Sequence, residues 1–317
     1  MNKNNKNNKN KNYIYILIVL IVAITIFGDK IKADNLNNLV EEVSNSNEIT
    51  NQIEKVEIDD NKEIKEGENL VIHYLDVGQA DSILIQNNGQ NMLIDAGTND
   101  KGKVVVDSLK KYGVEKVDYL VGTHPHEDHI GGLDNVIDNF EIGEIYMPKV
   151  KNNTKTFEDV LDAVSRKNLK ITSPNVGYKF NLGNATCEIM NCGTGTSEEI
   201  NNLNLSSIVI RMSYGEQSFL FMADAEKENE AARKWPQTNV LKVGHHGSNT
   251  SSTQEFLDQV KPKIAIISTG IGNKYGHPKK ETLDKLKKMD VRIYRTDENG
   301  TITLICDGKE NKISVEK

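Results

Sequence analysis

The sequence is poor in cysteine and has no excess of positive charge. Only three cysteines, Cys187, Cys192 and Cys306, occur among its 317 residues. Three thiols are too few for a disulfide framework or a four-thiolate zinc site, and for Cys187 and Cys192 a single bridge or two free thiols both stay open. The net charge of −7 argues against a protein that coats nucleic acid non-specifically, because such binding needs a basic surface. An enzyme that contacts a phosphodiester through one local site is not excluded.

No apolar run reaches the roughly 20 residues that span a bilayer comfortably. The longest, Tyr13–Phe27, follows a stretch of only Asn and Lys and precedes a polar exit. This pattern predicts a signal peptide or an uncleaved membrane anchor over residues 13–29, and the two alternatives stay open. Either one predicts an extracellular protein, secreted or tethered to the cell membrane. By composition, residues 1–12 are predicted to be a disordered basic tail and residues 30–68 an acidic flexible linker.

Internal repeats are also lacking, and residues 69–317 are predicted to form one α/β domain. Short β-branched runs such as Leu70–Leu75 and Val117–Val121 predict strands, and amphipathic stretches such as residues 157–167 predict helices. The early strands follow one another closely, while the later ones alternate with helices. We therefore expect two mixed β-sheets packed face to face, with helices on the outer faces. An Asn-Gly pair at residues 299–300 predicts a hairpin near the C-terminus.

The strongest motif is a loop after the predicted strand at residues 117–121. It reads Thr-His-Pro-His-Glu-Asp-His-Ile-Gly-Gly and holds four potential metal ligands within six residues: His124, His126, Asp128 and His129. Alternate side chains of an extended segment share a face, so His124 and His126 point the same way. Asp128 and His129 lie on the next turn and can face a second ion. Imidazole and carboxylate groups suit zinc, iron or manganese.

This loop resembles the H-x-H-x-D-H signature of the metallo-β-lactamase superfamily. The resemblance implies an αββα sandwich and two divalent metal ions, Zn²⁺ or Mn²⁺. It also implies two further aspartates, each after a strand: Asp95, which supports a ligand or the loop, and Asp224, which bridges the ions. The last ligand comes from the adjacent His245 and His246, and which of these two imidazoles binds stays open.

One part of the superfamily pattern is missing from this chain. Most members supply a third histidine to the first ion ahead of the bridging aspartate, where this sequence has an Asn-rich segment that includes Asn204. Water or an Asn carbonyl is expected to complete that ion. The Asn-rich segment, the Gly-Gln-Ala-Asp loop and a Tyr-Gly-His-Pro loop together are similar to the extracellular C-terminal domain of ComEC-type competence proteins. That subgroup implies that Gln79 and Asp81 lie near the metals and contact substrate or a ligand histidine; for Asp81, a turn acceptor is the alternative.

These features predict an extracellular metal-dependent hydrolase. The leading hypothesis is a phosphodiesterase that uses a metal-bridged hydroxide, and a nucleic acid stays open as its substrate. Asp128 is expected to bind one ion and orient the nucleophile. His277 is expected to protonate the leaving oxygen or to hydrogen-bond a phosphoryl oxygen, and a capped loop histidine is its alternative.

Rival functions stay open at this point. One group comprises a phosphorylcholine esterase, a lactonase and a β-lactamase-type hydrolase, all acting on small hydrolysable substrates. The other is a non-catalytic extracellular binding module with a degenerate metal site. The membrane is a partner only through an uncleaved N-terminal segment, and no protein partner is predicted.

Overall fold

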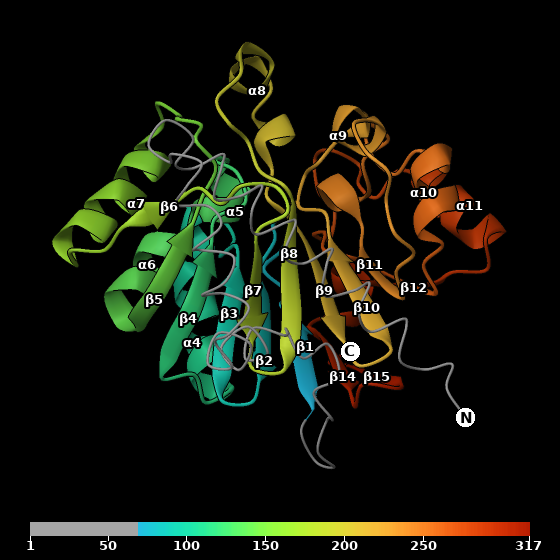
Figure 1. The fold of residues 1–317 in the computed structure, drawn as a ribbon, viewed down its shortest axis with the longest axis horizontal. Helices are drawn as coiled ribbons and strands as arrows, with labels where there is room; N and C mark the ends of the chain where they lie inside the picture. Colours follow the sequence, from blue (N-terminus) through green and yellow to red (C-terminus); the bar gives the residue numbers. More distant parts are fainter. Residues whose placement is uncertain (1–68) are drawn as a thin grey trace, which may run out of the picture. The chain divides into compact units, whose positions relative to one another are not determined.

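Two β-sheets form the centre of the fold (Figure 1). The computed structural model describes residues 69–317, so the predicted tail, signal or anchor, and linker lie outside the described residues. Within residues 69–317, no helix combines the length and the apolar character that a bilayer span requires.

The first sheet has eight strands in the order β15-β14-β1-β2-β3-β4-β5-β6. Its strands from β15 to β3 pair antiparallel, and those from β3 to β6 pair parallel, so the sheet is mixed. The bounds are β1 (Leu70–Tyr74), β2 (Ile83–Asn87), β3 (Gln90–Ile94), β4 (Lys116–Val121), β5 (Glu141–Tyr146), β6 (Ile171–Thr172), β14 (Ile302–Cys306) and β15 (Asn311–Val315).

The second sheet has seven strands in the order β13-β12-β11-β10-β9-β8-β7. Here β7 to β10 pair antiparallel and β10 to β13 pair parallel. The bounds are β7 (Lys179–Leu182), β8 (Ala185–Asn191), β9 (Val209–Tyr214), β10 (Gln217–Phe221), β11 (Val240–Lys242), β12 (Ile264–Ile267) and β13 (Arg292–Arg295).

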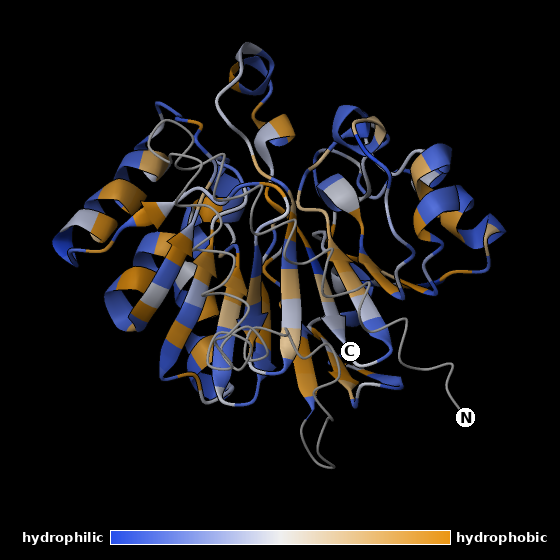
Figure 2. Cartoon of the chain, viewed as in Figure 1, coloured by the Kyte–Doolittle hydropathy of each residue, from blue (hydrophilic) through white to orange (hydrophobic). Residues whose placement is uncertain are grey.

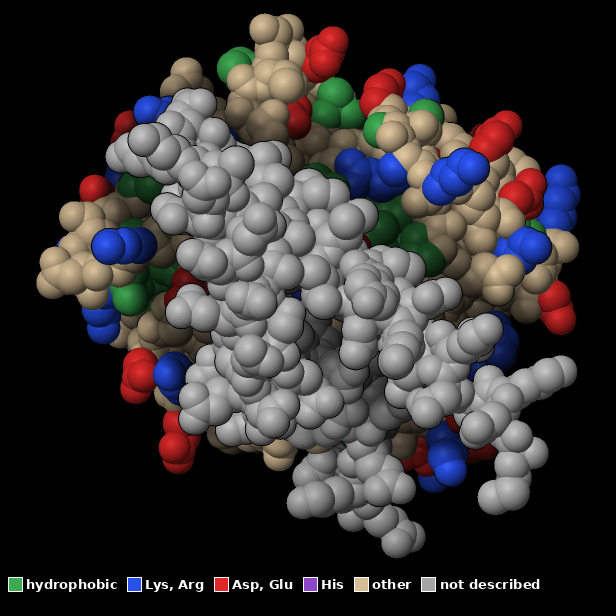
Figure 3. Space-filling view, viewed as in Figure 1, with side chains coloured by type: hydrophobic (Ala, Val, Ile, Leu, Met, Phe, Trp, Pro, Cys, Tyr) green, Lys and Arg blue, Asp and Glu red, His purple; other side chains and the backbone are tan. Residues whose placement is uncertain are grey.

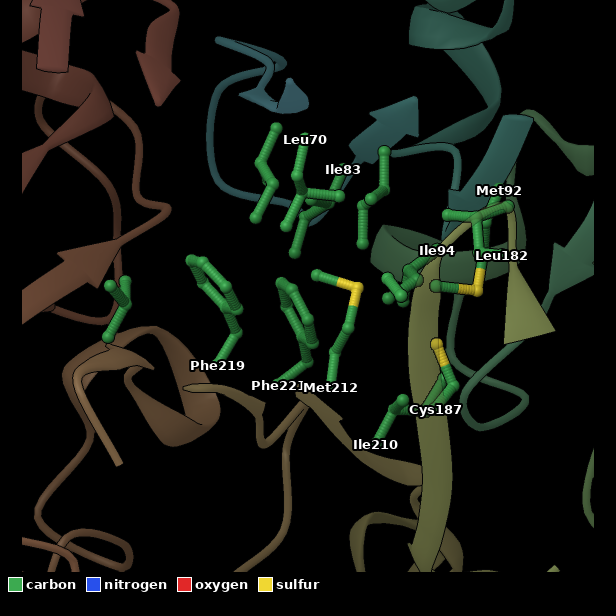
Figure 4. Packing of buried hydrophobic residues seen from close by; sticks show 14 of the residues in the cluster. Leu70, Ile83, Met92, Ile94, Leu182, Cys187, Ile210, Met212, Phe219 and Phe221 are labelled. Carbon is green, nitrogen blue, oxygen red and sulfur yellow. The ribbon is translucent and has the colours of Figure 1, made fainter. Parts of the chain in front are cut away.

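The main core fills the space between the two sheets (Figure 4). Alternate residues of a strand point to one face, so Ile72 and Tyr74 of β1 enter this core together, as do Phe219 and Phe221 of β10. The rings of Tyr74 and Phe221 lie 6.4 Å apart, which joins the sheets directly. Burial of such large apolar side chains is the main force that holds the sheets face to face.

Helices cover the outer face of each sheet (Figure 1). The apolar sides of α4, α6 and α7 pack in a second core against the first sheet, and those of α10 and α11 pack in a third core against the second sheet. Figure 2 shows apolar and polar residues on different sides of α6 and α7, and Figure 3 shows charged side chains of both signs on the part of this face that is not grey. The helix bounds are α4 (Gly102–Lys111), α5 (Glu127–Ile130), α6 (Leu133–Asn139), α7 (Lys155–Arg166), α8 (Ser197–Asn201), α9 (Lys227–Ala231), α10 (Gln254–Val260), α11 (Lys280–Lys288) and α12 (Thr296–Asn299).

The predicted αββα architecture is confirmed, but the predicted C-terminal hairpin is wrong. Strands β13 and β14 belong to different sheets, and α12 connects them. The Asn299 side chain accepts a hydrogen bond from the backbone N–H of Arg295 (2.9 Å), so it closes a helical turn. Gly300 follows with φ 65° and directs the chain into the first sheet.

The three cysteines are free and buried, which matches the free-thiol alternative for Cys187 and Cys192.

His73 is predicted to make stability depend on pH. Its ring stacks on Tyr112 at 3.7 Å and its Nδ1 lies 2.9 Å from the Thr303 hydroxyl. Burial, assisted by the charge of Lys111, lowers the pKa of His73 to about 4. Because the ordinary value is about 6.5, the unfolded chain binds more protons between pH 6.5 and 4, and stability falls as the pH drops through that range.

We therefore expect the unfolding free energy of the wild type to fall by up to about 2.5 kcal/mol more than that of H73Q between pH 7 and pH 4.5. Urea unfolding in the presence of a chelator measures both proteins without interference from bound metal. Equal losses in the two proteins would contradict this account of His73.

Candidate metal centre

The candidate ligands follow strands whose carboxyl ends meet at one edge of the sandwich. Asp95 follows β3, and the histidine-rich loop follows its parallel neighbour β4. In the second sheet, Asp224 follows β10 and the His245–His246 pair follows the parallel strand β11. Because parallel strands end on the same side of a sheet, segments far apart in sequence reach a common site.

The tightest group consists of Asp128, His129, Asp224 and His246. One ligand atom from each lies within 4.8 Å of all the others. His129 Nε2 is 3.3 Å from Asp224 Oδ1, and His246 Nε2 is 3.6 Å from the same oxygen. His246 Nε2 also lies 3.4 Å from Asp128 Oδ2. Two imidazoles and two carboxylates therefore face one point.

This group fits a divalent cation. His129 Nε2, His246 Nε2 and Asp224 Oδ1 are buried, and none of them has a hydrogen-bond partner among residues 69–317. An unpaired buried polar atom costs about 1–3 kcal/mol, so three such atoms around one point indicate a ligand that pairs with all of them. Nitrogen and oxygen donors without a thiolate suit zinc or manganese.

Hydrogen bonds on the far side of each imidazole fix its orientation. His129 Nδ1 donates to Asp95 Oδ2 at 2.7 Å, while Asp95 accepts further bonds from the backbone N–H and hydroxyl of Thr123. His246 Nδ1 donates to the carbonyl of Ser268 at 3.0 Å. Histidines that bind metals commonly donate their other ring nitrogen in this way, which leaves Nε2 free for the ion.

A second group gathers at the other oxygen of Asp224. His245 Nε2 is 3.5 Å and His124 Nε2 is 3.9 Å from Asp224 Oδ2. His126 joins this group, because its Nδ1 lies 3.0 Å from His124 Nε2. The sequence left open which member of the His245–His246 pair belongs to the site, and the structure brings both to Asp224, one to each oxygen.

The charges of the site favour a cation at its centre. Burial opposes protonation of His129, but Asp224, Asp95 and Asp128 outweigh it and hold the pKa of His129 well above its ordinary value. Burial likewise opposes ionisation of Asp224, yet the imidazoles of His129 and His246 hold its pKa well below the usual range. The field at this point therefore stabilises positive charge.

Asp81 lies beside the centre in a buried ion pair. The Lys242 ammonium donates to Asp81 Oδ2 at 2.7 Å, and Asp81 Oδ1 is 3.5 Å from His246 Nδ1. In the turn before Asp81, the side chain of Asp76 accepts the bond from the Gly78 N–H, while Asp81 Oδ2 accepts the bond from Lys242. Lys242 was not foreseen, although a lysine in the apolar run of β11 is an unusual feature of the sequence.

His277 lies at the open side of the second group. Its ring centroid is 5.6 Å from that of His245 and 5.7 Å from that of Tyr275, with which it stacks. Burial and the charges of His245 and His246 lower the pKa of His277 to about 4, and its Nδ1 has no partner among the described residues. Gln79 holds the start of this loop, since its side-chain oxygen accepts bonds from Thr269 and Gly270.

Asn204 is buried behind the second group. Its side-chain amide donates to Glu226 Oε1 at 3.3 Å, and Glu226 Oε1 in turn lies 3.1 Å from His245 Nδ1. Glu226 was also missed from the sequence, where it stands only two residues after Asp224. The catalytic roles predicted for Asp128 and His277 stay predictions.

The fold and this arrangement of ligands define a metallo-beta-lactamase domain, and the chain belongs to the metallo-beta-lactamase superfamily, whose family model matches residues 75–271. The chain is similar to ComE operon protein 3 of Bacillus subtilis, with 32% identity over 73% of this chain and 32% of that protein. It is also similar to Recombination protein 2 of Haemophilus influenzae, with 28% identity over 72% of this chain and 28% of that protein. The chain thus spans about a third of the length of these curated relatives.

Competence protein ComA of Neisseria gonorrhoeae is also similar, with 28% identity over 72% of this chain and 31% of that protein. These relatives confirm the resemblance to the competence-protein subgroup. Among solved structures, the metallo-beta-lactamase fold protein YhfI of Bacillus subtilis aligns with a TM-score of 0.48 and 13% identity, over 71% of this chain and 95% of that one.

Proposed function

We propose that this chain is a metal-dependent phosphodiesterase that binds two divalent ions, Zn²⁺ or Mn²⁺. The observation that carries the proposal is the position of Asp224, whose two carboxylate oxygens face two separate groups of imidazoles. Two ions held by these residues would lower the pKa of water towards 7 and would stabilise the negative charge of a phosphoryl group.

The residues of the chain itself have distinct roles in this proposal. Asp128 is the most exposed carboxylate of the tight group, with 30% of its side chain accessible, against 3% for Asp224. Asp128 is therefore the group best able to orient an incoming water molecule. His277 offers an unpaired Nδ1 beside His245 and is proposed to hydrogen-bond a phosphoryl oxygen of the substrate.

A nucleic acid is the phosphodiester that the relatives support. Recombination protein 2 is named for recombination and Competence protein ComA for competence, and both processes involve DNA. Because the chain is acidic, we propose that it contacts such a substrate at one local site. Contact along a long stretch of nucleic acid needs a basic surface. The N-terminal apolar run supports an extracellular location, either secreted or tethered.

The test is a substrate panel on the full chain, with and without added Mn²⁺ or Zn²⁺. The panel contains bis(p-nitrophenyl) phosphate, single- and double-stranded DNA, a phosphorylcholine ester, a lactone and nitrocefin, and H126A is the control variant. We expect metal-dependent cleavage of the phosphodiesters by the wild type and not by H126A. Equal rates for the two proteins on every substrate would contradict the enzyme hypothesis, and cleavage of nitrocefin, the lactone or the choline ester alone would favour a rival function.

A further inference from the structure

We propose that His245 is a ligand of the first ion, the one assigned to His124 and His126, in the place that the sequence left to water or an Asn carbonyl. We further propose that Glu226 is the positioning residue that orients His245. This inference rests on the two-ion centre proposed above. It names a third imidazole for the first ion, and it gives the Asn-rich segment a structural role in support of Glu226.

His245 faces the oxygen of Asp224 that the tight group does not use. Its Nε2 is 3.5 Å from Asp224 Oδ2, closer than His124 Nε2 at 3.9 Å. His246, by contrast, faces Asp224 Oδ1 at 3.6 Å. The two neighbouring histidines therefore serve opposite oxygens of one carboxylate, which is the arrangement that two separate ions require.

The backbone of this pair is strained in a way that serves this arrangement. Both residues are left-handed, with φ 47° and ψ 50° at His245 and φ 52° and ψ 26° at His246. Consecutive residues in an extended chain point to opposite faces, whereas this conformation lets both rings reach Asp224. Left-handed conformations cost non-glycine residues about 1–3 kcal/mol each and concentrate at functional sites. The His245 N–H donates to the carbonyl of Ala223 at 2.8 Å and holds the turn in place.

Glu226 fixes which ring nitrogen of His245 is free. His245 Nδ1 lies 3.1 Å from Glu226 Oε1 and 3.0 Å from the Thr250 hydroxyl, so it faces two acceptors and carries the proton. Glu226 Oε1 also accepts a hydrogen bond from the Thr250 hydroxyl at 2.8 Å, and the Asn-rich segment donates further bonds to this carboxylate. Because Nδ1 of His245 faces Glu226 and Thr250, Nε2 is left as the lone-pair donor, in the same way that Nε2 of His129 is left free by the bond from its Nδ1 to Asp95.

The Asn-rich segment supports Glu226 from behind. Asn202 donates to Glu226 Oε2 at 2.8 Å, and Asn204 donates to Oε1 at 3.3 Å. The Asn-rich segment thus holds the carboxylate that orients His245.

Equilibrium titration with Mn²⁺ alone tests this inference on the metal-free full chain, without substrate. The wild type is expected to bind two ions. H245A is expected to retain one at unchanged affinity and to bind the other at least about 100-fold more weakly, whereas E226Q weakens the same ion about 10–100-fold. E230Q is the matched control, because Glu230 is a buried carboxylate four residues further on that accepts bonds from Thr253 instead.

Two results would overturn the inference: H245A binding both ions as the wild type does, or H245A and E226Q weakening both ions equally. The cobalt(II) absorption spectrum gives a second reading, since loss of one imidazole changes the ligand field of one ion only. Because the titration contains no substrate, failure of the wild type to cleave phosphodiesters would count against the proposed function and not against this ligand assignment. E226Q tests the affinity of the same ion independently if H245A does not fold, because glutamine keeps a hydrogen-bonding side chain at position 226.

Discussion

Replacement of Asp224 by Asn is expected to disable both halves of the metal centre and to lower kcat/KM for a phosphodiester by about 1,000-fold or more. One carboxylate oxygen lies 3.3 Å from His129 Nε2 and the other 3.5 Å from His245 Nε2. An amide of the same shape loses the negative charge, and its NH₂ group points donor hydrogens at one of the two ions.

The measurement combines steady-state kinetics on bis(p-nitrophenyl) phosphate with the metal content of the purified protein. D118N is a matched control, because Asp118 is a partly buried aspartate in β4 that accepts a backbone bond from Asn91. We expect D118N to retain its metal and its activity. If D224N retains two ions and wild-type kcat/KM, then Asp224 does not bridge the centre.

Replacement of Lys242 by Met is expected to cost about 3–5 kcal/mol of folding stability, because it leaves a buried charge without its partner. Lys242 and Asp81 are both almost fully buried, and their charged groups lie 2.7 Å apart. Burial would raise the pKa of Asp81, but the ammonium group of Lys242 keeps it below the ordinary value. The pair also links the two sheets. Lys242 is the last residue of β11 in the second sheet, whereas Asp81 lies just before β2 of the first sheet, where its N–H donates to the carbonyl of Asp128.

Urea unfolding with a chelator present measures this cost separately from metal binding. The double variant K242M/D81N is expected to recover more than half of the loss, because it removes both charges together. K103M is the surface control, since the Lys103–Asp107 pair is exposed and such pairs contribute at most about 1 kcal/mol. A loss below about 1 kcal/mol in K242M would show that Asp81 does not depend on Lys242 for its charge.

The sequence predicted those parts of the site that are encoded by local patterns. The ligands between His124 and His129 lie in one short motif, and Asp95 and Asp224 each follow a recognisable apolar strand. The same holds for the layers of the fold, because the runs that form the sheets are rich in β-branched residues. The edge strands β6, β7 and β15 were missed, since β6 has only two residues, β7 has only four, and β15 has no buried residue.

The supporting contacts depend on packing between distant segments and were not predictable. Lys242 meets Asp81 across 161 positions of the chain, and this contact exists only because the two sheets pack face to face. The roles of His245 and His246 depend on two successive left-handed residues, which sequence patterns associate with Gly or Asn and not with His. The false hairpin prediction arose in a similar way, because an Asn-Gly pair fits a helical end as well as a two-residue turn.

The most direct test of the account is to remove and restore metal while following hydrolysis of bis(p-nitrophenyl) phosphate. We predict that the chelated full chain is inactive, that added Mn²⁺ or Zn²⁺ restores cleavage, and that activity saturates as two ions bind per chain. Full cleavage by the chelated protein, or no cleavage of any phosphodiester by protein that carries two ions, would contradict it.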